Sequence, residues 1–529
     1  MKIVLFVILY SFFGKLSEGQ LLLTPPLAQK FDVRAQEALK NCPYTPASLP
    51  ESLPNPLPNA LVDAFSNIAK QLNATVGDRC PSAVVTVAYK GQTIFSHGAG
   101  SISLTEDKKP NSDTIYRIGS VSKVFPVVQL YQLASQGRLS LDDTLHQLEN
   151  DSPILFENYF SEGQQPTLRD MASQLSGLPR EPPCDQDLIC HLTNTEMISR
   201  INGTTALIRE PGSYPSYSNM AYALLGRSLT PKGMSWEEYT QERILDTLGL
   251  SRTGFELNTS SLTNYAVGVN ANGKPQAPYS LGWNTPCGGM HSTTRDLNTL
   301  CNSIMDGTVL SETKSDKAKS LANALIAPAW MNAGGKTLFG TPWEMYFHNE
   351  TGFLVRRKGG NVPGYAALVA FVPELKLSVS ALWASKTIDE FGTSESLIDD
   401  LLPPFVSMIK DLGERGSMIQ PANQTQFVGM YTAPGVPSPN GDAQVVVYNG
   451  TLIVAIGALD IGVYLRVASP NAPKNVLQLY IPTTMAPCLP IELQALTNEF
   501  VVFQKSPGSE LFDTLEIPGY LAGLKYKRK

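Results

Sequence analysis

Two β-hairpin patterns enclose a long stretch of helical sequence, and this order restricts the possible fold more than any other feature. Residues 83–90 (AVVTVAYK) alternate like a strand, Gly91 and Gln92 predict a turn, and residues 93–98 return. A second pair of runs, residues 366–372 and 377–383, flanks the turn sequence PELK. Because strands come first and last with helices between them, we expect an α+β domain whose sheet is closed by both ends of the segment.

Helical patterns precede and follow the first hairpin. One covers residues 61–72, and another covers residues 121–136, where apolar residues recur at helical spacing before Gly137 ends the pattern. Residues 236–248 form a further candidate helix. Pro126 lies inside the second pattern, where proline removes a hydrogen bond, so a kink after the first turn is expected there.

The pattern changes after residue 412, and residues 413–529 are predicted to form a separate all-β domain. Residues 444–448 and 452–456 flank Asn449-Gly450, which is a strong short hairpin signal. Further strands are expected at residues 464–467, 476–481 and 500–503, and the set fits a small barrel. The basic residues 525–529 are expected to be a solvated tail.

The N-terminal residues have the features of a secretory signal. Lys2 is followed by an apolar stretch of eleven residues, Ile3 to Phe13, which is too short to span a bilayer, and cleavage is expected near Gly19. Residues 1–19 are therefore assigned to a signal peptide, residues 20–58 to a Pro-rich segment and residues 59–412 to the main domain. No later segment reads as membrane-spanning, and a secreted, extracellular protein is predicted. Seven glycosylation sequons agree with export: Asn73, Asn150, Asn202, Asn258, Asn349, Asn423 and Asn449.

The cysteines and the charge balance restrict the classes of function. Cys184 and Cys190 lie in one Pro-rich loop and are expected to close a small disulfide ring, and Cys42 is a candidate partner for Cys80. Seven cysteines leave at least one thiol free or intermolecular. No cluster of histidines or cysteines has metal-ligand spacing, so neither a metal nor a cofactor is expected. The net charge of -6 argues against a nucleic-acid partner.

Ser120 and Lys123, in the run YRIGSVSKVF, are the first candidate catalytic pair. Positions i and i+3 share one face of a helix, so the lysine amine can reach the serine oxygen. A neutral lysine beside a serine can take its proton and create a nucleophile. The same spacing recurs at Ser311 and Lys314 without further reactive residues nearby, so the motif needs partners elsewhere in the chain.

Two later segments supply such partners. Tyr217 and Asn219 lie in EPGSYPSYSNMAYALLG, and Lys358 begins the sequence KGGN that ends at Asn361. Taken singly, the tyrosine fits a packed aromatic residue, the asparagine a turn and the glycines a bend in a strand. Their order along the chain favours a shared acid–base site.

With these motifs in view, the chain resembles the serine β-lactamase and penicillin-binding-protein superfamily, in particular its class C and D-alanyl-D-alanine carboxypeptidase branch. The likeness covers about residues 60–410 and extends to LRDMASQLSGLP, PCGGMHSTTRDL and GGNVPGYAALVAFVPELKLSV. It implies an antiparallel sheet with a helical subdomain. It also implies a serine hydrolase that forms a covalent acyl-enzyme on an ester, amide or peptide bond of a small-molecule or peptide substrate.

The resemblance also implies residue roles. Ser120 corresponds to the nucleophile and Lys123 to the adjacent base. Tyr217 shares proton transfer to the leaving group and activates the deacylating water. Asn219 orients Lys123 and the substrate amide, and Lys358 adds positive charge beside Tyr217.

The third motif implies the substrate-binding strand, and it also departs from the family pattern. Gly359, Gly360 and Asn361 are the implied substrate-binding residues, and the backbone N–H groups of Ser120 and Asn361 form the implied oxyanion hole. Gly359 stands where penicillin-recognising members usually carry a hydroxyl that holds the antibiotic's carboxylate. Esterase, amidase or peptidase activity is therefore favoured over β-lactam hydrolysis.

Two other classes of function remain as alternatives. A non-catalytic binding protein with the same fold is compatible with the Gly359 departure and the added β domain, but the three reactive motifs are intact. An α/β-hydrolase is disfavoured because the chain has no GxSxG nucleophile elbow and no convincing histidine partner.

Overall fold

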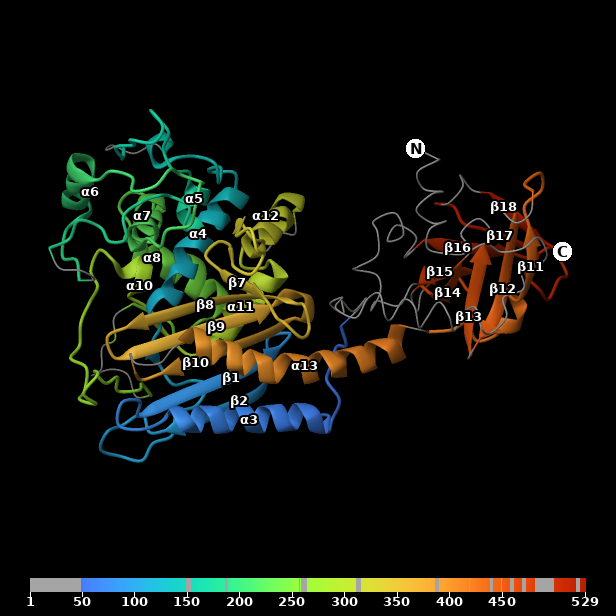
Figure 1. Ribbon diagram of the computed structural model, residues 1–529, viewed down its shortest axis with the longest axis horizontal. Helices are drawn as coiled ribbons and strands as arrows, with labels where there is room; N and C mark the ends of the chain where they lie inside the picture. The colour runs from blue at the N-terminus through green and yellow to red at the C-terminus, as the bar shows by residue number, and fades with distance from the viewer. Residues whose placement is uncertain are drawn as a thin grey trace. The chain divides into compact units, whose positions relative to one another are not determined.

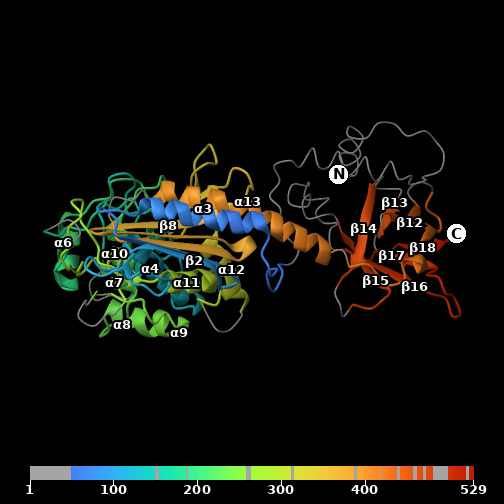
Figure 2. The ribbon, with the colours of Figure 1, turned by 90° about the horizontal axis from the view of Figure 1, so that it is seen from below.

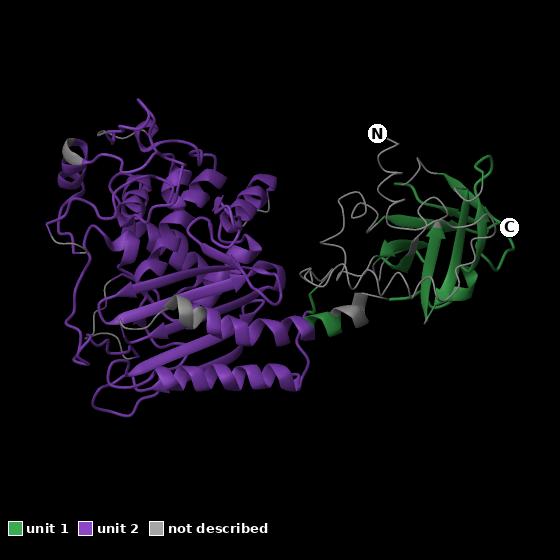
Figure 3. Ribbon diagram, viewed as in Figure 1, with its two compact units in different colours: residues 1–50, 409–529 green, residues 51–408 purple. Residues whose placement is uncertain are grey.

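The computed structural model of the chain describes residues 49–148, 154–185, 189–255, 257, 264–310, 315–385, 390–417, 419–437, 441–448, 450–456, 461–468, 472–480, 499–519 and 524–529. The chain divides into two compact units, residues 51–408 and a second unit that contains residues 409–529 (Figure 3). The predicted domain boundary at residue 412 lies inside helix α13 (Glu390–Ser417). The predicted signal peptide and most of the Pro-rich segment lie outside the described residues.

An antiparallel eight-stranded sheet forms the centre of the first unit, which confirms the α+β prediction (Figure 1). Strand β1 pairs with β2 on one side and with β10 on the other, and Ala83 lies opposite Trp383. The two ends of this segment therefore pair with each other, as the second and third strands of the sheet. In order across the sheet, the strands are β2 (Gln92–Gly100), β1 (Ser82–Tyr89), β10 (Leu377–Trp383), β9 (Tyr365–Val372), β8 (Leu354–Val362), β7 (Glu344–Phe347), β6 (Leu338–Phe339) and β5 (Trp330–Met331).

The first hairpin turns one residue earlier than predicted. Tyr89 pairs with Gln92, so the turn residues are Lys90 and Gly91 rather than Gly91 and Gln92. Both turn residues have positive φ, 48° and 75°, which is the conformation that a tight two-residue hairpin requires. The second hairpin, formed by β9 and β10, lies where the sequence predicts it.

Helices cover both faces of the sheet. Helices α3 and α13 lie on one face, and α4 (Val124–Ser135) and α11 (Thr294–Asp306) lie on the other (Figures 1 and 2). Because both faces are covered, all eight residues of β1 are buried. Helix α3 (Asn59–Thr75) buries Leu61, Ala64, Phe65, Ile68 and Leu72, which form one apolar stripe along the helix.

The remaining helices build the subdomain beside the sheet. No helix among the described residues is long and apolar enough to cross a bilayer. The predicted helix at residues 236–248 is present and contains a π-helical turn in its middle. The elements are α5 (Leu168–Ala172), α6 (Asn194–Thr204), α7 (Asn219–Leu229), α8 (Trp236–Thr240), the π turn η3 (Gln241–Leu245), α9 (Asp246–Leu248), α10 (Thr285–Gly288), α12 (Asp316–Ile326), and the short pair β3 (Tyr116–Arg117) and β4 (His291–Ser292).

The helix predicted at residues 121–136 begins as a tighter turn. Residues Gly119–Lys123 form the 3₁₀ turn η1, and α4 follows directly. The helix α4 is buried on all sides from Val124 to Ala134, which is typical of a central core helix. Pro126 is the third residue of α4, in the first turn, where N–H groups have no intrahelical partner, so the proline removes no hydrogen bond within α4.

The second unit contains a closed antiparallel barrel of strands β11 to β18, which confirms the predicted all-β domain. The predicted Asn-Gly hairpin is formed by β12 and β13, with Tyr448 opposite Thr451. Aromatic residues fill the barrel core together with aliphatic side chains. The strands are β11 (Gly429–Thr432), β12 (Asp442–Tyr448), β13 (Thr451–Ile456), β14 (Ile461–Val467), β15 (Val476–Tyr480), β16 (Phe500–Gln504), β17 (Thr514–Glu516) and β18 (Lys525–Arg528).

The basic C-terminal residues are not a solvated tail. They form β18, which pairs with β17 and with β11 and so closes the barrel. Tyr526 is buried in the core, while the flanking lysines face outward. Arg528 donates to Tyr431 Oη at 2.9 Å and to the Gln426 carbonyl at 3.0 Å. The prediction of a tail was wrong because Tyr526 is the one apolar residue of β18, so the sequence shows almost no alternation of apolar and polar residues.

One of the two suggested disulfides is formed. Cys184 and Cys190 are bonded, as predicted. Cys80 is a buried free thiol whose Sγ lies 3.6 Å from the Ser82 carbonyl oxygen, so the suggested pair with Cys42 is wrong. Burial raises the pKa of the Cys80 thiol to about 12, which keeps it protonated. Cys42 itself lies outside the described residues.

Candidate active site

Ser120 and Lys123 face each other on the 3₁₀ turn η1. A 3₁₀ helix has three residues per turn, so residues three apart lie directly above one another. Lys123 Nζ accordingly lies 3.0 Å from Ser120 Oγ. The lysine side chain is fully buried, whereas Ser120 remains partly accessible. The serine is thus accessible to a substrate, while the lysine amine contacts the serine oxygen from the buried side of the turn.

Lys123 is held by three acceptors, which equals the number of hydrogens on a charged amine. Besides Ser120 Oγ, it donates to Asn219 Oδ1 and to the Cys287 carbonyl oxygen, both at 2.7 Å. Asn219 is the first residue of α7, whose N-terminus is capped by the Ser218 side chain. Cys287 lies in α10, one of the elements that sequence reasoning did not connect with the site. These contacts account for the burial of a charged side chain.

Tyr217 contacts the nucleophile from the other side. Its Oη lies 2.7 Å from Ser120 Oγ, and its ring is 5.0 Å from Lys123 Nζ and 5.6 Å from Lys358 Nζ. Burial disfavours the charged phenolate, but the two ammonium groups outweigh this effect and hold the pKa of Tyr217 below its ordinary value. The tyrosine is therefore suited to exchange a proton with the serine.

Lys358 lies on β8 and is neutralised by a neighbour on β7. Lys358 Nζ donates to Glu344 Oε1 at 2.6 Å and to the Gly359 carbonyl at 2.9 Å. The lysine is 1% exposed, and the glutamate is 17% exposed. The predicted cation is thus present beside Tyr217, and it is paired with a carboxylate, Glu344, that belongs to none of the three sequence motifs.

Two glycines let β8 approach the serine turn. A Cβ at Gly360 would lie 2.1 Å from the Ile118 carbonyl oxygen and 2.9 Å from Ser120 N. Gly119 has a φ of 49°, and a Cβ there would lie 2.8 Å from Asn361 N. Residues with side chains would push the two segments apart. The backbone amides of Ser120 and Asn361, implied as an oxyanion hole, are therefore brought to the same place.

A cavity of about 400 Å³ opens beside Ser120. Four of the predicted site residues line it, together with groups that the sequence analysis missed. Arg180 and Glu181 directly follow the quoted run LRDMASQLSGLP, so their position next to that motif was the signal that could have found them. The lining residues are Ser120, Arg180, Glu181, Tyr217, Asn219, Cys287, Gly288, Asn361 and Val362.

Glu181 connects to the lysine through Asn219. Asn219 Nδ2 donates to Glu181 Oε1 at 2.7 Å, and Asn219 Oδ1 accepts from Lys123. A carboxylate can only accept hydrogen bonds, and an ammonium can only donate them, so the two neighbours fix the orientation of the amide. Glu181 therefore helps to position Lys123 without touching it.

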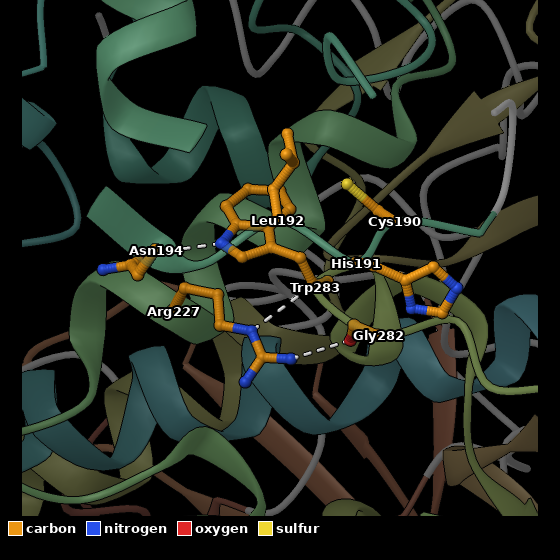
Figure 4. A pocket seen from close by; sticks show the side chains of 7 residues that line it. All are labelled: Cys190, His191, Leu192, Asn194, Arg227, Gly282 and Trp283. Carbon is orange, nitrogen blue, oxygen red and sulfur yellow. Dashed lines mark hydrogen bonds between the residues drawn. The ribbon is translucent and has the colours of Figure 1, made fainter. Parts of the chain in front are cut away.

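A separate cavity of about 330 Å³ lies beside residues 282 and 283, in the segment that leads to Cys287 (Figure 4). Arg227 projects from α7 and donates to the carbonyls of Gly282 and Trp283 at 3.0 and 3.2 Å, and it pairs with Glu237 at 2.7 Å. Trp283 Nε1 donates to Asn194 Oδ1 at 3.1 Å. Arg227 thereby ties residues 282 and 283, which precede α10, to α7 and to Glu237 of α8.

The candidate site brings together the five catalytic residues that the sequence analysis proposed. Ser120, Lys123, Tyr217 and Asn219 form one connected hydrogen-bond group, and Lys358 lies beside the Tyr217 ring. Within the described ranges, no group of three or more histidine, cysteine or acidic side chains is arranged to hold a metal ion. The arrangement provides a hydroxyl, two proton-exchanging partners and two backbone amides where η1 meets β8, which suits acyl transfer.

The sequence of this chain is similar to proteins of the β-lactamase family. The sequence model of the family described as Beta-lactamase matches residues 65–400. The chain is 32% identical over 403 residues to the human protein named Putative beta-lactamase-like 1, covering 74% of this chain and 78% of that protein. It is 28% identical over 379 residues to Beta-lactamase-like protein 2 of Dictyostelium discoideum, covering 66% of this chain and 68% of that protein.

Solved structures with a similar fold have lower sequence identity. The octameric penicillin-binding protein homologue from Pyrococcus abyssi matches with a TM-score of 0.53 and 19% identity, covering 88% of this chain and 100% of that chain. The β-lactamase/D-alanine carboxypeptidase from Yersinia pestis matches with a TM-score of 0.53 and 19% identity, covering 66% of this chain and 99% of that chain. At 19% sequence identity, these similarities show a shared fold alone.

Proposed function

Because this chain belongs to the β-lactamase family, within the serine β-lactamase and penicillin-binding-protein superfamily, we propose that it is a secreted serine hydrolase that forms an acyl-enzyme on Ser120. One observation carries the proposal: Ser120 Oγ lies between Lys123 Nζ at 3.0 Å and Tyr217 Oη at 2.7 Å. A serine between two proton-exchanging groups is the arrangement that an activated nucleophile needs.

In the proposed reaction, Ser120 Oγ attacks the carbonyl carbon of an ester, amide or peptide bond. Either a Tyr217 phenolate or Lys123, once its ammonium has lost a proton, takes the serine proton as the new C–O bond forms. The negative oxygen is stabilised by the N–H groups of Ser120 and Asn361. As the bond to the leaving group breaks, Tyr217 gives it a proton. Water then attacks the acyl carbonyl carbon, and Tyr217 takes a proton from that water. As the acyl–serine bond breaks, the group that deprotonated the serine returns a proton to Ser120 Oγ.

The third motif affects the proposed substrate. Gly359 offers no hydroxyl to a substrate carboxylate, and Lys358 beside it is already paired with Glu344 at 2.6 Å. We therefore expect esters, amides or peptides to be better substrates than β-lactams.

Extracellular location is part of the proposal. The Cys184–Cys190 disulfide fits an oxidising compartment, and this bond is formed. Four sequon asparagines lie in the described residues, and all four are exposed, as glycan attachment requires. They are Asn73, Asn202, Asn349 and Asn423.

Active-site labelling tests the proposed function. A fluorophosphonate probe is expected to label the purified protein, and mass spectrometry of the digested adduct is expected to place the label on Ser120. Ser122→Ala is the matched control, since Ser122 Oγ accepts from Met290 N at 3.1 Å and does not contact Ser120. Folded protein that takes up no label, or a label that persists in Ser120→Ala, contradicts the proposal and supports the non-catalytic binding alternative.

The pH dependence of hydrolysis is expected to report on Tyr217. A phenolate base is active only when deprotonated, so kcat/KM rises with pH through the Tyr217 pKa, which lies below its ordinary value. Lys358→Met removes one cation and leaves Glu344, which itself opposes ionisation of Tyr217, so the acidic limb moves to higher pH. Ester hydrolysis measured across pH at constant ionic strength checks this, and Arg138→Ala, an exposed arginine outside the site, is the control. An unshifted limb in Lys358→Met assigns the base to another group.

A further inference from the structure

Arg180 is an exposed cation at the opening of the active-site cavity, and the reaction outlined above does not use it. Its side chain is 68% exposed and lines the same cavity as Ser120. Its backbone is fixed, because the Arg180 carbonyl accepts from Asn219 N at 2.7 Å and from Met220 N at 3.3 Å. The guanidinium is thus carried by a segment that is anchored to the start of α7.

The guanidinium is oriented by two neighbours. Its Cζ lies 5.0 Å from the centre of the Tyr217 ring, which is a distance typical of a cation stacked on an aromatic face. Its Nε lies 3.4 Å from Glu181 Oε1, the same oxygen that accepts from Asn219 Nδ2. In the described part of the chain, Glu181 is the one carboxylate paired with Arg180. The Nη1 and Nη2 groups of Arg180 donate no hydrogen bond to these described residues. The planar fork that suits a carboxylate is therefore available.

Accessibility distinguishes Arg180 from the other charged groups around the cavity. Among the described residues near Tyr217, three cations (Lys123, Lys358 and Arg180) stand against two carboxylates (Glu181 and Glu344). In the proposed reaction either Tyr217 is ionised or Lys123 has lost its proton, so these charges balance and an anionic ligand depends on a direct contact. The contacts of Glu344 and Lys358 pair them with each other, and Lys123 is buried beneath Ser120. Arg180 is thus the exposed cation that a ligand in the cavity can reach.

We propose that Arg180 is a specificity-determining residue that binds a carboxylate on the acyl donor. This inference rests on the proposed function, and it names the substrate class: esters or amides that carry a carboxylate close to the scissile carbonyl. The guanidinium stacks on the ring whose hydroxyl contacts the nucleophile, so a carboxylate held there lies near a carbonyl placed at Ser120. Arg180 thereby supplies the anion contact that Gly359 lacks.

Two pairs of chromogenic esters test this proposal. In the first pair the carboxylate is on the acyl side: p-nitrophenyl hydrogen adipate against its neutral methyl ester. In the second it is on the leaving group: 4-acetoxybenzoate against methyl 4-acetoxybenzoate. In at least one pair, the wild-type kcat/KM for the anionic ester is expected to exceed that for the neutral ester by about tenfold or more at low salt. The pair that shows the preference locates the carboxylate.

Substitution of Arg180 isolates its contribution. Arg180→Ala is expected to bring the anionic-to-neutral ratio of kcat/KM close to one, and Arg180→Lys to retain a smaller preference, because it keeps the charge and loses the fork. Arg138→Ala, which removes an exposed arginine outside this cavity, should keep the wild-type ratio. A wild-type ratio near one in both pairs, or a preference that persists in Arg180→Ala, overturns the proposal.

A binding measurement separates this proposal from the proposed function. Ser120→Ala cannot be acylated, so calorimetry with the intact esters reports recognition alone. Tighter binding of an anionic ester than of its neutral partner by Ser120→Ala, lost in the double variant Ser120→Ala/Arg180→Ala, supports the role of Arg180 even if no ester is hydrolysed. Hydrolysis of both members of each pair at equal rates contradicts the role of Arg180 and leaves the serine hydrolase intact.

Discussion

Replacing Lys123 by methionine is expected to lower kcat/KM for ester hydrolysis by about a thousandfold or more. The change removes the amine that lies 3.0 Å from Ser120 Oγ, and a positioned acid–base group contributes roughly 10²–10⁴-fold to rate. Tyr217 remains in contact with the serine, but its pKa rises once the Lys123 charge is absent. Both proton-exchanging partners are thus impaired by one substitution. Steady-state kinetics and the rate of fluorophosphonate labelling measure the loss.

The same substitution affects folding less than its burial suggests. Methionine leaves Asn219 Oδ1 and the Cys287 carbonyl without their donor, which costs about 1–3 kcal/mol for each buried acceptor. It also removes the desolvation penalty of a buried ammonium, which acts in the opposite direction. Thermal unfolding should therefore show a cooperative transition, so that the lost activity is not explained by unfolding. Lys123→Met that retains wild-type kcat/KM would place the base elsewhere.

Local patterns predicted the parts of this fold that depend on local physics. The strands β9 and β10 and the turn between them were identified because strand propensity and turn chemistry are properties of neighbouring residues. Ser120 and Lys123 were identified for the same reason, although the element that joins them is a 3₁₀ turn rather than an α-helix. The hairpin turn at Lys90 was misplaced by one residue because Gly91 fits either position of the turn.

Contacts between segments that are far apart in the chain could not be predicted from the sequence. The Cys287 carbonyl has no side-chain signature, and its bond to Lys123 depends on how α10 packs against η1. Glu344 is the one charged residue of strand β7 and Arg180 lies in a loop, and neither belongs to a motif with a distinct spacing. Their meeting with Lys358 and Tyr217 is a consequence of strand order and loop path. Sequence reasoning therefore missed the charged residues Glu344 and Arg180, which act on the pKa of Tyr217 and on the proposed substrate choice. It found the groups that take part in the proposed reaction.

Replacing Gly360 by alanine is expected to abolish most activity and to destabilise the first unit by about 2 kcal/mol or more. The added Cβ would lie 2.1 Å from the Ile118 carbonyl oxygen and 2.9 Å from Ser120 N, and both are backbone atoms that cannot move aside as a side chain can. Either β8 or η1 must shift, and the amides of Ser120 and Asn361 then separate. Loss of one oxyanion donor alone costs about 10²–10³ in kcat, so a fall of at least a hundredfold is expected.

The origin of this effect can be tested with a glycine that has space around it. A Cβ at Gly334 meets no atom within 4 Å, so Gly334→Ala should keep wild-type kcat and a wild-type midpoint of chemical unfolding. Gly119→Ala should resemble Gly360→Ala, because it adds a Cβ 2.8 Å from Asn361 N at a φ of 49°. The two damaging variants act on one contact from opposite sides, so their double variant should cost less than the sum of the single effects. Full additivity, or wild-type activity in Gly360→Ala, would show that the close approach of β8 to η1 does not form the oxyanion site.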